Sequence, residues 1–153
     1  MSVLPQSAQY LPPPRQAREA KSRAQKLDEF CEYAYDFENN ELATRDGKHY
    51  YVYGNEAMKI WIYKAMVTAR FRHSAYSRRF GTEVYDLVGE VISDKLKREE
   101  IKRYITEAVM VHPYMRAITS IDLHPHKAGL EVDVTYRTVF DGEVEKVSCI
   151  VQI

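Results

Sequence analysis

The sequence predicts an α+β fold: three helices packed on an antiparallel sheet that ends in a β-hairpin, preceded by an extended N-terminal arm. Apolar residues recur at helical spacing through the middle of the chain and at every second position near its end. The first 27 residues are instead rich in proline and arginine and carry almost no apolar stripe. A chain of 153 residues with 45% hydrophobic content can bury one core. We therefore expect an arm over 1–27 and one α+β domain over 28–153.

The predicted arm opens with a segment that resists helix formation. Pro12, Pro13 and Pro14 hold the backbone in an extended form. Residues 15–26 favour a helix but lack an apolar face, so such a helix would need a partner. Within 1–27 five cations oppose one acid, a net charge of +4, and the neutral chain therefore leaves −4 for the rest. This segregation favours docking between complementary surfaces.

Two short aromatic strands should follow the arm. Residues 30–37 alternate between aromatic and polar or small side chains, the period of two that is typical of a strand. Asparagines at 39–40 and the Asp46-Gly47 pair mark turns. Residues 48–53 form the second predicted strand.

Three helices are predicted next. The first begins at Asn55, a good N-cap, and should direct Ile60, Trp61 and Ala65 inward. The second begins at Thr82, and its apolar stripe consists of Val84, Leu87, Val88, Val91 and Ile92. The third begins near Ser93 or Asp94, shows the cleanest helical period in the chain and ends at Pro113.

The C-terminal region switches to a period of two. Ile121 and Leu123 belong to one predicted strand, and residues 130–136 form the next. Asp141-Gly142 is a strong hairpin signal. The last strand runs to the final residue, and one of its faces carries Val147, Cys149, Val151 and Ile153.

Signals for catalysis, metal or cofactor binding are weak. Three groups were candidates: the carboxylates Glu83, Asp86 and Glu90, the histidines His112, His124 and His126, and the thiols Cys31 and Cys149. The carboxylates lie at the start of a predicted helix, where a solvated face is usual. The histidines lack further ligands at metal spacing, and the cysteines lack a motif that would lower their pKa. No glycine-rich phosphate loop and no apolar run of membrane-spanning length occurs. We expect no enzyme, no cofactor, no metal and no membrane contact.

The segment 68–81, here called the connector, is the most distinctive candidate surface. It carries basic and aromatic side chains and no carboxylate: Arg70, Phe71, Arg72, His73, Tyr76, Arg78, Arg79 and Phe80. Arginine and aromatic residues are enriched where proteins bind one another. The same mixture can bind nucleic acid, although the acidic stretches elsewhere would repel phosphate. A plain solvated loop is the third interpretation, and the residues alone leave all three open.

The pattern resembles a phage tail family, the small XkdS-like baseplate-wedge proteins of contractile-tailed phages and phage-like particles. The residues that carry the resemblance are Tyr33-Ala34-Tyr35-Asp36-Phe37, Asp46-Gly47-Lys48, Gly54-Asn55-Glu56-Ala57, Trp61-Ile62, Thr68, Arg70, Tyr76-Ser77, Phe80-Gly81, Glu83 and Leu87-Val88-Gly89. The wider family often has an acidic-Pro-Arg motif after its third helix. This chain departs from it with His112-Pro113-Tyr114, and Arg116 follows two residues later.

The resemblance implies a structural part of the tail baseplate, assembled in the host cytoplasm and carried in the virion. Family members occur in six copies, bundle with a larger wedge protein beside the tail hub and tube proteins, and initiate the sheath. A C-terminal sheet receives strands from the sheath protein. From this resemblance and the connector we predict that partners bind Arg70, Phe71, Arg72, Tyr76, Arg78, Arg79, Phe80, Arg116, Val147, Cys149, Val151 and Ile153. The alternatives are a lysozyme-like cell-wall glycosidase and a nucleic-acid-binding module.

Overall fold

The computed structural model describes residues 30–140 and 143–153. The helical elements are α1 (Gly54–Val67), the 3-10 helix η4 (Val84–Leu87) and α2 (Asp94–Met110). The strands are β1 (Cys31–Tyr33), β2 (Tyr35–Asp36), β3 (Glu41–Leu42), β4 (Thr44–Arg45), β5 (Lys48–His49), β6 (Tyr51–Tyr53), β7 (Met115–His126), β8 (Gly129–Thr138) and β9 (Glu145–Val151). The predicted arm, its helix over 15–26 and the Asp141-Gly142 turn lie outside the described residues.

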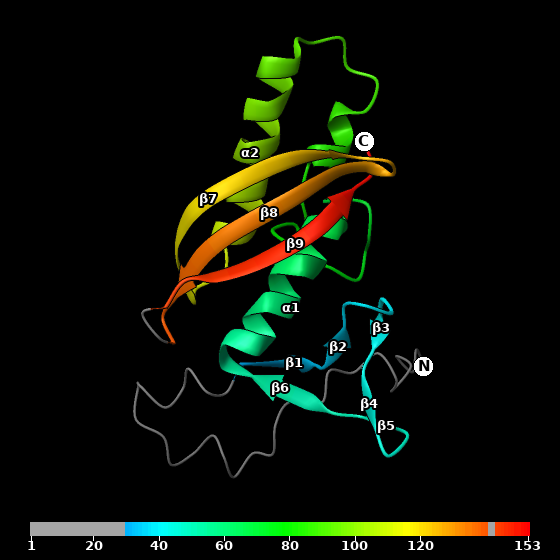
Figure 1. Ribbon diagram of the computed structural model, residues 1–153, viewed down its shortest axis with the longest axis vertical. Helices are drawn as coiled ribbons and strands as arrows, with labels where there is room; N and C mark the ends of the chain where they lie inside the picture. Colours follow the sequence, from blue (N-terminus) through cyan, green and yellow to red (C-terminus); the bar gives the residue numbers. More distant parts are fainter. Residues whose placement is uncertain (1–29, 141–142) are drawn as a thin grey trace.

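The main sheet is antiparallel, with strand order β7-β8-β9. Its inner face packs on the two α-helices, with α1 under β9 and α2 under β7 (Figure 1). Alternate residues point inward because side chains change face at every step of a strand. Val132 pairs with Cys149 and Val134 with Val147, and all four side chains are buried. Among the described strands, only β8 pairs with β9, so β9 is an edge of the sheet.

The prediction of three helices is wrong, because the structure has two α-helices in its described part. The segment predicted as the second helix forms only the four-residue η4, which buries Val84 and Leu87. The chain leaves helical conformation at Val88, whose ψ is 122°, and Gly89 follows with a φ of +82°. Val88 and Val91, which were expected to face inward, are 57% and 100% exposed. Separate helical and antiparallel segments remain, as in an α+β protein.

The aromatic N-terminal segments are strands, but each is interrupted. The predicted strand over 30–37 splits into β1 and β2, because Ala34 instead donates its N–H to Tyr50 and accepts from Ala43. β1 pairs with β6, β2 with β3 and β4 with β5, and these short ladders lie near the N-terminal end of α1 (Figure 1). Both expected turns are present, with left-handed backbone at Asn40 and Asp46.

The N-terminal ends of α1 and α2 differ in whether the residue predicted to begin the helix caps it. Ser93 caps α2 as predicted, since its hydroxyl accepts the N–H of Leu96, and Pro113 follows the helix end. Asn55, by contrast, is not the N-cap: α1 already begins at Gly54, and the Asn55 amide oxygen accepts a hydrogen bond from the Thr138 hydroxyl. This bond joins the start of α1 to the end of β8.

The largest buried side chain of the sheet, Tyr136, carries a hydroxyl that has no hydrogen-bond partner among the described residues. Burial also raises the pKa of this phenol. An unpaired buried hydroxyl costs about 1–3 kcal/mol. Tyr136→Phe keeps the ring and removes the hydroxyl, so we expect the free energy of unfolding to rise by about 1 kcal/mol.

The measurement is urea denaturation followed by circular dichroism, and Tyr85→Phe is the matched control. The Tyr85 hydroxyl donates to the carbonyl of Met66 at 3.2 Å, so its removal should lower stability by about 1 kcal/mol. A loss of stability in Tyr136→Phe would contradict the prediction.

Candidate partner-binding site

A groove of about 720 Å³ runs along the free edge of β9, and we call it the β9 groove. Ser148, Cys149 and Ile150 all line it. Consecutive residues of a strand point to opposite faces, so a groove that all three line must follow the edge of the strand rather than one face. Its other lining residues are Tyr35, Phe37, Asn40, Tyr63, Val67, Tyr85, Ala128, Glu131 and Gln152.

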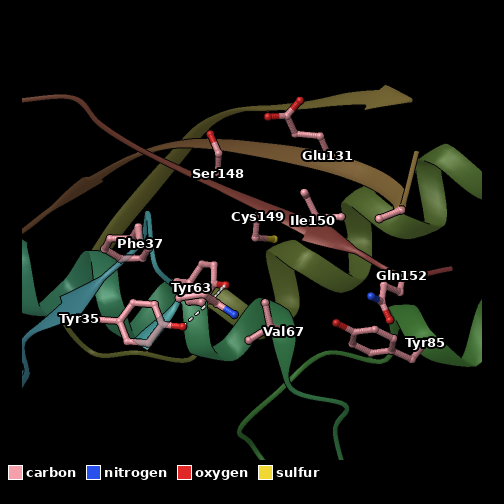
Figure 2. Close-up of a pocket in the computed structure, with 12 residues that line it drawn as sticks. Tyr35, Phe37, Tyr63, Val67, Tyr85, Glu131, Ser148, Cys149, Ile150 and Gln152 are labelled. Carbon is pink, nitrogen blue, oxygen red and sulfur yellow. Dashed lines mark hydrogen bonds between the residues drawn. The ribbon is translucent and has the colours of Figure 1, made fainter. Parts of the chain in front are cut away.

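The floor of the β9 groove comes from α1. Tyr63 and Val67 rise from α1 toward β9, with Tyr35 and Phe37 at one end and Tyr85 at the other (Figure 2). Residues four apart on a helix lie on the same face, about 6 Å apart along the axis. Side chains on one face of a strand repeat at about 6.6–6.8 Å. An extended chain beside β9 would therefore place successive inward side chains against Tyr63 and Val67.

Hydrogen bonds fix the aromatic end of this groove. Asn40 is held in a left-handed turn, and its amide oxygen accepts hydrogen bonds from Tyr35 at 2.5 Å and Tyr63 at 2.9 Å. Burial raises the pKa of the Tyr63 hydroxyl and that of Tyr85, the latter to about 12, so both rings are neutral. Neutral hydroxyls and aromatic faces suit a peptide better than a charged group.

Of the C-terminal residues predicted to bind a partner, Val147, Cys149 and Val151 lie on the inner face of β9, and Ile153 follows the end of the strand, which was predicted to run to the last residue. Val147, Cys149 and Val151 are buried and Ile153 is partly buried, so these side chains belong to the core. Cys149 lies 3.8 Å from the sulfur of Met66, and burial raises the pKa of its thiol to about 12. A partner at this strand would meet main-chain N–H and C=O groups at the edge, as in strand addition.

The connector is an exposed loop with a closed base. Arg70 donates its N–H to Thr82, and Thr82 donates to Thr68, so the two ends of the loop lie side by side. Residues 71–79 are exposed, including Phe71 at 60%. The Arg70 guanidinium donates to the carbonyl of Arg78 and stacks on Phe71. The predicted connector side chains therefore gather on one loop, and Arg116 is exposed at the start of β7.

A row of rings connects this loop to the core. Tyr76 contacts Phe80, Phe80 contacts Trp61, and Trp61 contacts the buried His112. Phe30, Tyr114 and Phe140 continue the row on the inner side. These contacts join the C-terminal part of the connector, at Tyr76 and Phe80, to the core.

The remaining candidates do not form a reactive cluster in the described part of the chain. Asp86 pairs with Arg72 at 3.2 Å on the surface, and His124 faces Asp133 on the outer face of the sheet. Cys31 and Cys149 are both buried. Within residues 30–140 and 143–153 no set of three or more histidine, cysteine or acidic side chains is placed to hold a metal. None of the described helices is long and apolar enough to cross a bilayer.

Sequence reasoning missed the side chains that line the β9 groove. Tyr63 and Val67 fall outside the predicted inward stripe of the first helix, although Ile60 and Ala65 of that stripe are buried as expected. Their spacing of four residues was the available signal, since it marks a second apolar face. Tyr85 and Asn40 are distant in sequence from β9, and only the folded structure brings them to the groove.

A strand edge that no other described strand pairs with, a lined groove and an exposed loop anchored by ring contacts are features of a protein that assembles with other proteins. The family model of the contractile injection system sheath initiator matches residues 31–141. The phage-like element PBSX protein XkdS of Bacillus subtilis (strain 168) is 32% identical over 111 residues, which cover 69% of this chain and 72% of that protein. The chain therefore belongs to the contractile injection system sheath initiator family. It is a structural component of a phage-type contractile tail, carried in the virion, and acts with other tail proteins such as the sheath.

Proposed function

We propose that this chain starts sheath assembly by accepting an extended strand of the sheath protein along the edge of β9. The observation that carries the proposal is the edge of β9 that pairs with no other described strand, beside a groove of about 720 Å³. An exposed edge offers unpaired N–H and C=O groups to another chain, and main-chain bonds then provide affinity while neighbouring pockets select side chains. Tyr63 and Val67 would receive the inward side chains of the added strand.

The finer arrangement also belongs to this proposal. The chain would be a wedge subunit of the baseplate that bundles with a larger wedge protein, in six copies around the hub and tube. The connector would contact a second tail protein, because its arginines and aromatic rings are exposed and ring contacts join its C-terminal part to the core. Support for these points comes from the family resemblance and from the exposure of the connector.

The strand-addition step is tested by Val67→Glu. Val67 is 38% exposed and is the last residue of α1, so a carboxylate there can stay hydrated while it blocks the apolar floor of the groove. We expect the fraction of tails that carry sheath to fall at least tenfold, because an added strand would have to bury this charge. The measurement is a count of sheathed tails by negative-stain electron microscopy after complementation of a deletion strain.

Met110→Glu is the matched control. Met110 is 39% exposed and is the last residue of α2, so both substitutions place an acid at a helix C-terminus with the same dipole penalty. Met110 does not line the β9 groove, and sheath assembly should remain normal. Normal sheath in Val67→Glu, or equal loss in both variants, would refute strand addition at this groove.

A further inference from the structure

A second groove, of about 240 Å³, lies between the connector and the C-terminal end of α2, and we call it the connector groove. Its lining residues are Trp61, Ser77, Arg79, Phe80, Val111, His112 and Pro113. Trp61 and Tyr63 are two residues apart on α1, which places them about 200° apart around the helix axis. The connector groove and the β9 groove therefore lie on opposite sides of α1.

The walls of the connector groove are apolar and fixed. The rings of Trp61 and Phe80 meet edge to face at 5.7 Å, and Trp61 and His112 meet in the same way at 4.5 Å. Val111 is 44% exposed although it is apolar, and Pro113 beside it is exposed too. A single apolar side chain of a partner would be enclosed by these groups, which gives the surface the form of a small anchor pocket.

The polar groups that line this groove can donate hydrogen bonds, and none of them is a carboxylate. The Arg79 guanidinium has no hydrogen-bond or ion-pair partner among the described residues. The N–H of Tyr114 donates to Nδ1 of His112, so in the neutral ring Nε2 carries the hydrogen. Burial lowers the pKa of His112 to about 4, and the ring is neutral near pH 7. The Ser77 hydroxyl is a further donor.

The charged side chains of the connector all have the same sign. Arg70, Arg72, Arg78 and Arg79 all belong to the connector, and the described ion pair among them joins Arg72 to Asp86. A groove with donors and an unpaired guanidinium is complementary to a group that only accepts, and an ionised carboxylate is such a group. A phosphate would meet the guanidinium equally well, but it would leave the apolar walls without a partner.

We propose that the connector groove binds an acidic peptide segment of a tail protein, in which a carboxylate pairs with Arg79 and an adjacent apolar side chain packs between Trp61, Phe80 and Pro113. This inference rests on the proposed contact between the connector and a second tail protein, and it adds the chemistry of that contact. This inference does not depend on the proposed strand addition at the β9 groove.

The chain contains one tryptophan, so the fluorescence of Trp61 reports on this groove alone. The probe is a 12-residue peptide of alternating glutamate and leucine, titrated into the full-length protein. We expect it to change the Trp61 emission with a saturable curve, and we expect Arg79→Gln to weaken binding about tenfold, the usual worth of a charge-assisted hydrogen bond. Val111→Ser should weaken it severalfold through the loss of apolar contact.

Arg78→Gln is the matched control, because it removes the same charge from the same loop and does not line the groove. It should change binding less than twofold. Absence of a response in the wild-type protein, equal loss in Arg78→Gln and Arg79→Gln, equal binding of a lysine–leucine peptide, or tighter binding of a single-stranded oligonucleotide would each overturn the assignment.

Failure of this inference can be told apart from failure of the proposed connector contact. If Arg78→Gln and Arg79→Gln both reduce incorporation of the protein into tails while peptide binding is unaffected, the connector contact stands and the groove assignment falls. If neither substitution reduces incorporation, the proposed contact itself falls.

Discussion

Gly129→Ala is expected to detach the end of β9 and to lower the free energy of unfolding by roughly 2–4 kcal/mol. Gly129 begins β8 with a φ of +143°, a conformation that residues with a side chain rarely adopt. A Cβ atom there would lie 2.3 Å from the carbonyl oxygen of Val151 and 3.0 Å from the Cα of Gln152. Both are backbone atoms, so relief requires the strand itself to move.

The consequence should reach the β9 groove, since Val151 is fully buried and Gln152 lines the groove. Urea denaturation measures the loss of stability, and hydrogen–deuterium exchange should show faster exchange at the end of β9. Gly47→Ala is the control: its φ is +74°, but a Cβ there meets nothing within 4 Å, so it should cost only about 1–2 kcal/mol of strain. Equal costs in the two variants would contradict the close-approach argument.

Acidification from pH 6.5 to pH 4 is expected to destabilise the protein through His112. Burial among the rings of Phe30, Trp61 and Tyr114 lowers the pKa of this imidazole to about 4, whereas in the unfolded chain it is about 6.5. Between these values the unfolded chain binds a proton that the folded chain does not, so stability falls as the pH falls. The total loss is on the order of 2–3 kcal/mol and is complete near pH 4.

The measurement is the midpoint of urea unfolding at pH values from 7 to 4. His112→Gln, whose amide oxygen can still accept from Tyr114, should remove most of this slope, while substitution of the exposed His126 by glutamine should leave it. Asp133 titrates in a different window: its hydrogen bond from Ser148, and then its contact with Lys146, lower the pKa of its carboxyl. Its contribution is therefore lost only below about pH 4. A slope that survives in His112→Gln would contradict the assignment.

Periodicity predicted the long elements well because their packing repeats along the chain. α2 has its helical stripe buried at Ile101, Ile105, Ala108 and Val109. β9 buries every second residue, and β8 buries the predicted Val132, Val134 and Tyr136, with Asp133 buried between them. The segment 82–92 also has helical spacing, yet it forms only η4. The backbone is extended at Val88 and left-handed at Gly89, and the next helix has its own cap at Ser93. A short apolar stripe does not stabilise a helix where the rest of the protein leaves its side chains exposed.

The two grooves could not be predicted from the sequence, and the reason is different. The β9 groove joins residues from β2, α1, η4 and β9, and no local pattern states that these segments meet. The connector was recognised as a surface from its composition, but the enclosure of Trp61 and His112 beneath it depends on ring contacts between distant segments. Composition indicates what a surface can bind, and only the fold shows where a partner's side chain can enter.

The position of α1 between the two grooves has a mechanical consequence. A strand added along β9 would meet a pull along its own length with several main-chain hydrogen bonds at once, which would share the load in shear. If both proposed contacts form, that load would pass to α1 through Tyr63 and Val67 and could leave it on the far side at Trp61. One helix would thus transmit tension between a strand added at β9 and a partner bound at the connector groove, across the width of a single helix.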